Sequence, residues 1–421
     1  MFKKTTLNNK LRIITIPLKN VNTVTFLVLV GTGSKYEGRE INGISHFLEH
    51  MFFKGTAKRP DTLAIAETLD RVGGAYNAFT SKDVTGYWAK VDKKHQDVAL
   101  DWISDIFLNS KLEQKELEKE KGVIIEEFNM YLDTPTAYIG DLWEKVLYGD
   151  QPAGWLVIGE KENILNMSRE KIVDYFSKHY SAKNTLICVA GNISPKAAEA
   201  KVKKYFKDIN TTPVSDKKRV VESQGKPESL IYFKDTDQTH LCLGVRAYNS
   251  SHPDRFALGL LATILGGNMS SRLFIKVREK RGLAYYVRTS AEENNDTGWL
   301  STQAGVDHKN IEEVIKLVLE EYKSLKNNLI TKEELQKAKD YAKGSMTLSL
   351  ESSDTQAFFY AEQELLRKKI MTPEDIFKKI DQVSINGINK VAKDIFKPEK
   401  LNLAVIGPFK DKEKFDKLLT I

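Results

Sequence analysis

Residues 44–52 read ISHFLEHMF, and this stretch combines a packing pattern with a chemical one. At about 100° of helical rotation per residue, its apolar side chains fall on one stripe, as in a helix that faces a core; they are Ile44, Phe47, Leu48, Met51 and Phe52. His46, Glu49 and His50 gather on the opposite side, where two imidazoles four residues apart can reach one metal ion. Glu49 can then take a proton from a metal-bound water. The stretch predicts a helix that packs on one face and presents a metal site on the other.

A catalytic zinc ion usually takes three protein ligands, so this pattern needs a third. Residues 113–132 read as a long helix with an apolar stripe of Leu117, Ile124, Phe128 and Tyr131. Glu120 and Glu127, seven residues apart, fall inside that stripe, whereas Glu126 points away from it. A carboxylate that faces a core is costly unless it is paired or bound to metal. The periodicity therefore favours Glu127 or Glu120 over Glu126 and leaves the choice between those two open.

Four motifs together resemble the pitrilysin/insulinase family of zinc peptidases, which carry the inverted HxxEH motif: HFLEH at 46–50, MFFKGT at 51–56, GGAYNAFT at 73–80 and EKEKGVIIEE at 118–127. Within the family, the likeness is to the subfamily of the mitochondrial processing peptidase β subunit and the bacterial processing proteases. It extends over nearly the whole chain. The resemblance implies one zinc ion per chain, held by His46, His50 and Glu127, with Glu49 as general base. It also implies a catalytic role for Glu120, which would support the ligands and the activation of water.

The composition indicates a soluble globular protein, with 41% hydrophobic and 29% charged residues among 421. This length suggests two domains. The net charge of +7 is spread thinly, and no basic patch with interleaved aromatic residues indicates nucleic-acid binding. No apolar stretch is long enough to span a membrane and the start, MFKKTTL, lacks a signal core, so we expect a cytoplasmic protein. Cys188 and Cys242 lie in apolar, strand-like runs, where buried free thiols are expected.

The order of elements is similar on either side of a polar stretch at residues 211–228, which reads as a linker. In each half, strands are followed by helices, which indicates an α+β plan built twice. We expect a zinc-binding domain at residues 1–210 and a homologous domain at 229–421, each a mostly antiparallel sheet packed with helices. The second domain has no metal motif, because Met269–Arg272 reads MSSR at the matching place. The resemblance implies that the chain forms half of a clamshell-like chamber.

The second domain contains Arg278 and Tyr285 in the sequence VREKRGLAYYV. Taken alone, these residues are most simply an exposed arginine and a strand tyrosine in a core. The resemblance implies instead that they hold the substrate backbone and the reacting carbonyl, where a tyrosine or arginine could stabilise an oxyanion by hydrogen bonding.

The strand expected at residues 75–80 is a candidate for substrate binding, because an extended peptide can add to a sheet edge through backbone hydrogen bonds. The residues concerned are Ala75, Asn77, Ala78 and Phe79. In the family, the Asn-Ala pair that matches residues 77 and 78 serves this purpose. Sequence alone leaves open whether the strand lies at an edge or inside the sheet.

Together these features predict a zinc metalloendopeptidase that acts on extended peptides or unfolded segments. The family's single-chain members are much longer, so we expect a homodimer in which the second domain of one copy completes the site of the other. A heterodimer with a metal-less homologous subunit is the alternative. Two other classes are open: a non-catalytic assembly subunit, and a metal-dependent hydrolase of a non-peptide ester or amide.

Overall fold

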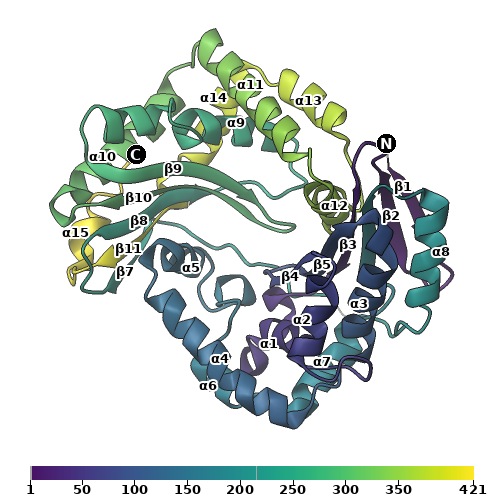
Figure 1. Cartoon of the computed structure of the whole chain (residues 1–421). Helices are drawn as coiled ribbons and strands as arrows, with labels where there is room; N and C mark the ends of the chain where they lie inside the picture. Colours follow the sequence, from purple (N-terminus) through teal and green to yellow (C-terminus); the bar gives the residue numbers. More distant parts are fainter. Residues whose placement is uncertain (1, 215) are drawn as a thin grey trace. The chain divides into compact units, whose positions relative to one another are not determined.

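The structure, a computed structural model, describes residues 2–214 and 216–421 (Figure 1). The chain packs as two compact units, and each is a sheet covered by helices. The first unit comprises residues up to Asn129, Leu156–Lys218 and Leu348–Ile370; the second comprises Met130–Trp155, Arg219–Thr347 and Met371–Ile421. The α+β class with two such domains is therefore confirmed. The sequence boundaries 1–210 and 229–421 stay a prediction, since the units follow packing rather than chain order.

The first unit is built on a six-stranded sheet with the order β1-β2-β6-β3-β5-β4. Its strands are β1 (Lys3–Thr6), β2 (Arg12–Pro17), β3 (Thr23–Val30), β4 (Ala75–Thr80), β5 (Thr85–Asp92) and β6 (Thr185–Gly191). Only the β2–β6 pair is parallel. The central strands β3 and β6 are buried almost throughout, because α3 (Gln96–Asn109) and α12 (Ser353–Glu362) pack on the sheet. This double cover explains why both strands read as continuous apolar runs.

The second unit repeats this plan without β1, with the strand order β7-β11-β8-β10-β9. The strands are β7 (Glu228–Phe233), β8 (Thr239–Arg246), β9 (Ala284–Glu293), β10 (Gly298–Val306) and β11 (Leu401–Gly407). Its first and last strands, β7 and β11, pair in parallel, as β2 and β6 do in the first sheet. The last strand of the first sheet, β6, lies between β2 and β3, and the last strand of the second, β11, lies between β7 and β8. Apart from β1, the two halves therefore share one topology.

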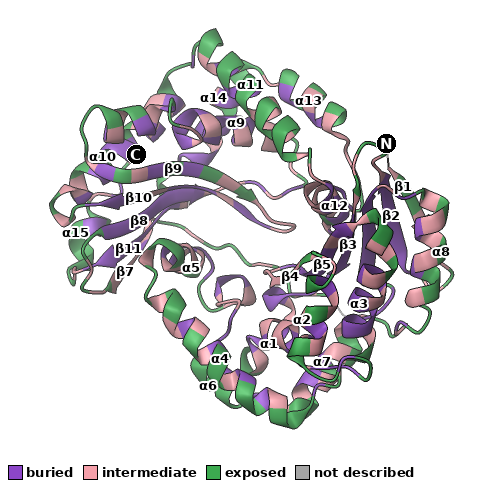
Figure 2. Ribbon diagram, viewed as in Figure 1, coloured by how far each residue is buried: buried purple, intermediate pink, exposed green. Residues whose placement is uncertain are grey.

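Helices cover both sheets, and their buried stripes face the strands while their outer faces are exposed (Figure 2). The first unit contains α1 (Ile44–Met51), α2 (Thr62–Asp70), most of α4 (Gln114–Leu132), α6 (Lys161–Leu165), α7 (Arg169–His179) and α8 (Pro195–Tyr205). The second contains α9 (Arg255–Gly266), α10 (Ile311–Asn327), most of α11 (Lys332–Ser349), α13 (Pro373–Asp381), α14 (Ile385–Ile395) and α15 (Lys412–Asp416).

Two helices pack on the sheet that the other half of the sequence supplies. Helix α5 (Pro135–Tyr148) lies on β8 and β11, where Trp143 joins a buried cluster with Ala404 and Ile406. Helix α12 lies on β3 and β6, and the hydroxyls of Ser353 and Thr25 are 2.9 Å apart. Each core therefore depends on residues far away in sequence, which the repeat of elements did not predict.

Two smaller expectations have clear outcomes. Cys188 and Cys242 are buried free thiols, and burial raises the pKa of both. The stripe expected on α4 is wrong at Tyr131, which is 40% exposed, because the cover over the apolar face of this helix ends after Phe128. Among the described residues, no helix is long and apolar enough to cross a membrane.

Candidate metal centre and its surroundings

The helix that carries the histidines begins at a turn held by a buried glutamate. Gly43, at the N-cap of α1, has φ +99° and offers no capping side chain. The Glu37 carboxylate instead accepts hydrogen bonds from the backbone N–H of Gly43 (2.8 Å) and Ser45 (2.9 Å) and from Asn42 Nδ2 (2.9 Å). It thus satisfies amides that the first turn of a helix leaves unpaired, at the end where the helix dipole favours an anion. Glu37 is only 5% exposed, so it fixes the direction in which α1 starts.

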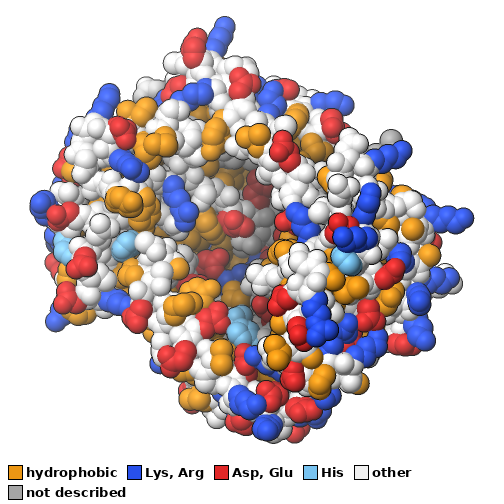
Figure 3. All heavy atoms as spheres, in the orientation of Figure 1, with side chains coloured by type: hydrophobic (Ala, Val, Ile, Leu, Met, Phe, Trp, Pro, Cys, Tyr) orange, Lys and Arg blue, Asp and Glu red, His pale blue; other side chains and the backbone are white. Residues whose placement is uncertain are grey.

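Three potential ligand atoms converge beside α1. The Nε2 atoms of His46 and His50 are 3.3 Å apart, and Glu127 Oε2 of α4 lies 3.6 Å from the first and 3.4 Å from the second. Among the described residues, this is the group of His, Cys, Asp and Glu side chains that could hold a metal ion. Figure 3 shows histidine side chains next to acidic ones over α1 and α4, at a surface open to solvent. Glu126, by contrast, is exposed and points away.

The spacing of these atoms fits a tetrahedral zinc ion. Zinc–nitrogen and zinc–oxygen bonds of about 2.0–2.1 Å place neighbouring ligand atoms about 3.3 Å apart, close to the separations seen here. Two imidazole nitrogens and one carboxylate oxygen suit zinc and leave a fourth position open. The His46 and His50 rings also hold the pKa of Glu127 well below its usual range, so this carboxylate is ionised and ready to bind a cation.

A second layer of contacts orients His50. Its Nδ1 lies 2.8 Å from Glu120 Oε1, which leaves Nε2 to face the ligand triangle. Glu120 Oε2 lies 2.7 Å from Lys54 Nζ, and Glu120 is only 3% exposed. Burial would raise the pKa of Glu120, but the His50 and Lys54 contacts outweigh it and lower that pKa. For His50, burial lowers the pKa, while its contacts with Glu120 and Glu127 raise it to about 9.

His46 lacks such a second contact. Its Nδ1 is buried and has no hydrogen-bond partner within the described part of the chain. The ring packs edge-on against His50, with ring centroids 4.6 Å apart. The two histidines are thus held differently: His50 by a buried carboxylate, and His46 by packing.

Glu49 lies on the same face of α1 but is not part of the ligand triangle. Its Oε2 accepts a hydrogen bond of 2.5 Å from Thr80 Oγ1, at the end of β4. Burial raises the pKa of Glu49, and the Thr80 hydroxyl and the two nearby histidines oppose that rise. A carboxylate beside the ligands, held by a hydroxyl and partly removed from water, is suited to move a proton.

Strand β4 is an edge strand, which answers the question that the sequence left open. The hairpin to β5 is closed by the Ser81 N–H, which donates to Val84 O (2.8 Å). Antiparallel pairs alternate, so the backbone N–H and C=O groups of Tyr76, Ala78 and Thr80 point away from β5 toward the free edge. In the structure, the backbone N–H of Ala78, which points outward, donates a hydrogen bond to Asn77 Oδ1 (2.8 Å).

The other side chains of this strand differ in surroundings. Ala75 and Asn77 are exposed. Phe79 packs against Phe358 of α12, with ring centroids 5.5 Å apart, so its side chain belongs to the core of the first unit. Backbone groups are therefore what β4 offers along its free edge.

In the second unit, Arg278 and Tyr285 lie together. The Arg278 guanidinium stands 4.9 Å from the ring centre of Phe274 and 5.7 Å from that of Tyr285. Tyr285 is 75% exposed near the start of the edge strand β9, rather than in a core. Arg272, in the MSSR stretch, is occupied by an ion pair with Glu334 (2.7 Å).

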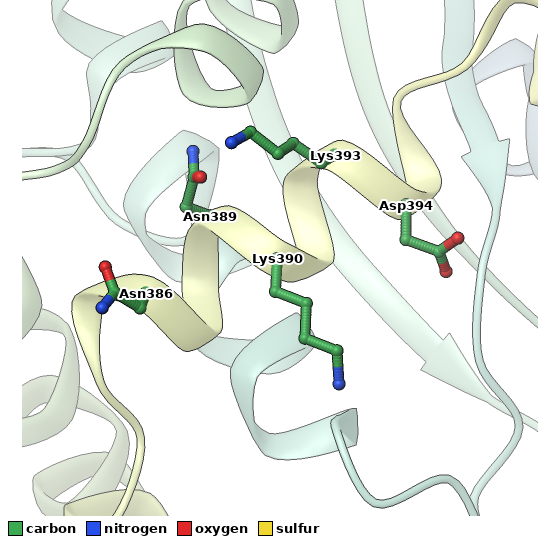
Figure 4. Close-up of a pocket in the computed structure, with 5 residues that line it drawn as sticks. All are labelled: Asn386, Asn389, Lys390, Lys393 and Asp394. Carbon is green, nitrogen blue, oxygen red and sulfur yellow. The ribbon is translucent and has the colours of Figure 1, made fainter.

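A depression of about 490 Å³ lies on α14, far in sequence from these residues. It is lined by Asn386, Asn389, Lys390, Lys393 and Asp394. Figure 4 shows that these side chains diverge from the helix instead of meeting at one point. Lys390 is moreover paired with Asp254 (2.7 Å). This place shows none of the convergence that the α1 site has.

Sequence reasoning missed three residues that hold the site: Glu37, Lys54 and Thr80. Lys54 lies in the motif MFFKGT and Thr80 in the motif GGAYNAFT, but neither motif by itself predicts their contacts with Glu120 and Glu49. A signal for Glu37 did exist, because a helix that starts at a glycine needs a capping group from elsewhere.

Fold and site together define a class: two α+β units of one plan, of which the first carries a His-x-x-Glu-His helix and a glutamate from a second helix. Residues 12–159 match the family model described as insulinase (peptidase family M16), and residues 166–341 match the model of the peptidase M16 inactive domain. The chain is 38% identical to the uncharacterized zinc protease YmxG of Bacillus subtilis, over 97% of this chain and 98% of that protein. The chain belongs to the insulinase family, peptidase family M16.

Other comparisons agree. An uncharacterized zinc protease of Mycobacterium leprae is 34% identical over 99% of this chain and 94% of its own length. Among solved structures, a protease from Helicobacter pylori has a TM-score of 0.89, with 24% identity over 97% of this chain and 99% of that one. A chain of Complex III2 from Candida albicans has a TM-score of 0.86, with 18% identity over the full length of both. These two structures share the fold with this chain.

Proposed function

We propose that this protein is a zinc-dependent metalloendopeptidase that hydrolyses extended peptides or unfolded segments. The observation that carries the proposal is the triangle of His46, His50 and Glu127, with sides of 3.3–3.6 Å, beside the carboxylate of Glu49. Membership of a peptidase family and the zinc-protease names of relatives along the whole chain support it. The single ligand cluster among the described residues supports a stoichiometry of one zinc ion per chain.

Each residue has a defined task in this proposal. His46, His50 and Glu127 hold the zinc ion, which when bound acidifies a water molecule and polarises the peptide carbonyl. Glu49 accepts the proton of the attacking water on its carboxylate and then delivers it to the leaving amine nitrogen. Glu120 keeps the His50 ring in place by accepting a hydrogen bond from Nδ1–H.

The free edge of β4 is the observation that supports an extended peptide as the substrate. A peptide that adds to this edge would bond to the outward backbone groups of Tyr76, Ala78 and Thr80, with Asn77 giving up its contact with Ala78. Thr80 is the last residue of this strand and donates a hydrogen bond to Glu49. A peptide bound along the edge would therefore reach the proposed general base. Recognition through the backbone favours unfolded segments and gives weak side-chain selectivity.

A peptide library tests the proposal directly. We expect the purified chain with one equivalent of zinc to cleave quenched unstructured peptides of eight or more residues, and to lose this activity to a chelator and regain it with zinc. A folded protein without unstructured segments should resist. Zinc binding with ester hydrolysis but no peptide cleavage would favour a non-peptide hydrolase, and zinc binding with neither would favour the assembly-subunit alternative.

We further propose a homodimer in which Arg278 and Tyr285 of one copy serve the zinc site of the other. The exposure of Tyr285 and its contact with Arg278 support a role outside the core of their own unit. Tyrosine and arginine would donate hydrogen bonds to the oxyanion that forms at the reacting carbonyl. A heterodimer with a metal-less homologous subunit is the alternative.

Mixing two inactive variants tests this arrangement. One variant carries Glu49→Gln, and the other carries Arg278→Ala with Tyr285→Phe. If sites are shared, mixed dimers each regain one complete site, and random exchange in an equal mixture restores about one quarter of the wild-type activity. Arg281→Ala, which removes an exposed arginine paired with Glu313, is the control and should keep full activity. No recovery in a mixture that does form mixed dimers would contradict a shared site.

A further inference from the structure

The hydroxyl of Thr80 makes a contact that strand formation does not require. It donates to Glu49 Oε2 over 2.5 Å, a short bond of the kind made to an ionised acceptor. Any β-branched residue would suit the strand position equally well, including valine, which has the same shape and no hydroxyl. The hydroxyl therefore acts on Glu49 and not on the sheet.

Glu49 depends on this contact for its orientation. Among the described residues, Thr80 is the one side chain that hydrogen-bonds to the Glu49 carboxylate. A glutamate has several rotatable bonds and loses much freedom when it is fixed. Without the hydroxyl, the carboxylate would spread over several orientations beside the histidines.

Thr80 itself sits on a rigid support. The next residue closes the hairpin, with the Ser81 N–H donating to Val84 O (2.8 Å). The loop after β3 braces the same turn, because the Lys35 N–H donates to Lys82 O (3.0 Å). Lys35 Nζ also forms a buried ion pair with Asp83 (3.1 Å). The hairpin end is thus anchored on two sides, and it can hold a side chain at a fixed place.

We infer that Thr80 is a positioning residue for Glu49, and that it sets the carboxylate of the base in register with the edge strand that takes the peptide. This inference rests on the proposed function. The backbone of Thr80 faces the free edge of β4 while its hydroxyl holds the base, so substrate alignment and base alignment share one residue. Its effect should appear in the turnover step and not in zinc binding.

The test compares Thr80→Val, which keeps the shape, with Thr80→Ser, which keeps the hydroxyl. We expect Thr80→Val to lower kcat about 10- to 100-fold, the usual loss when a supporting contact is removed, with KM and zinc affinity close to wild type. Thr80→Ser should restore most of kcat. In a Glu49→Gln background, Thr80→Val should cause no further loss, because the residue acts through Glu49.

A matched control lies on the opposite edge of the same sheet. Thr5 of β1 also donates to a glutamate, Glu199 (3.3 Å), and Thr5→Val should leave kcat unchanged. A readout apart from activity is the crystal structure of Thr80→Val, in which we expect the Glu49 carboxylate to leave its present position, and that of Thr80→Ser, in which we expect it to stay.

The outcomes separate the inference from the proposed function. An active wild-type chain whose Thr80→Val variant has unchanged kcat and an unmoved Glu49 overturns the inference alone. Equal losses in Thr80→Val and Thr80→Ser would also overturn it, because they would assign the effect to shape. A zinc-loaded wild-type chain that cleaves no peptide contradicts the proposed function, and this inference with it.

Discussion

We expect Glu49→Gln to keep one zinc ion per chain and to lose peptide hydrolysis. The reason is that Glu49 lies beside the ligand triangle without belonging to it. In the proposed mechanism its carboxylate is the group that accepts the proton of water. A general base contributes about 10²- to 10⁴-fold to a rate, and glutamine has no basic oxygen with which to replace it. The measurement is kcat on a quenched peptide, with zinc content determined by atomic spectroscopy on the same sample.

Glu40→Gln is the control for this experiment. Glu40 is an exposed acid in the short 3-10 helix Arg39–Ile41 before α1, so the same chemical change there should alter neither zinc content nor kcat. If Glu49→Gln retained full activity, Glu49 would not be the base. Loss of zinc in this variant would instead make Glu49 a ligand, in conflict with the triangle described above.

Glu127→Gln and Glu126→Gln, adjacent on α4, should differ strongly in zinc affinity. Glu127 supplies Oε2 to the triangle at 3.4 Å from His50 Nε2, whereas Glu126 is exposed to solvent. Loss of a supporting residue typically weakens metal binding about 10- to 100-fold, so the loss of a ligand should exceed that range. Competition with a chromophoric chelator measures the affinity, and peptide hydrolysis at limiting zinc should fall in parallel.

Glu120→Gln provides an intermediate point in this series. Glu120 contacts His50 Nδ1 at 2.8 Å and not the triangle itself, so its substitution should weaken zinc binding less than Glu127→Gln and more than Glu126→Gln. Circular dichroism of all three variants checks that the fold is kept. The assignment of the third ligand would fail if zinc stayed bound to Glu127→Gln and was lost from Glu120→Gln.

Periodicity was informative wherever neighbours in space are also neighbours in sequence. In α1, the predicted apolar stripe is buried, and the chemical face points the other way. In α4, periodicity separated Glu126, which is exposed, from Glu120 and Glu127, which face inward. It failed at Tyr131, because the pattern shows where a core could lie and not where cover by other elements ends.

The sequence by itself determined the parts of the site that lie on one helix. His46, Glu49 and His50 share a face because three- and four-residue separations bring side chains together in any α-helix. It also determined the α+β plan of two units, since each half shows the same succession of strand and helix patterns. These features depend on local geometry, so they can be predicted from the sequence without knowledge of contacts between distant segments.

Only the tertiary structure decided which distant residues complete the site. Thr80 reaches Glu49 because β4 pairs with β5 at the edge of the sheet, and Lys54 reaches Glu120 because the turn after α1 meets α4. Tertiary packing likewise decides that α5 lies on β8 and β11 and that α12 lies on β3 and β6, although each helix belongs to the other half of the sequence. Pairing and packing between distant segments depend on which surfaces the whole chain can bury together, and no local period in the sequence records that choice.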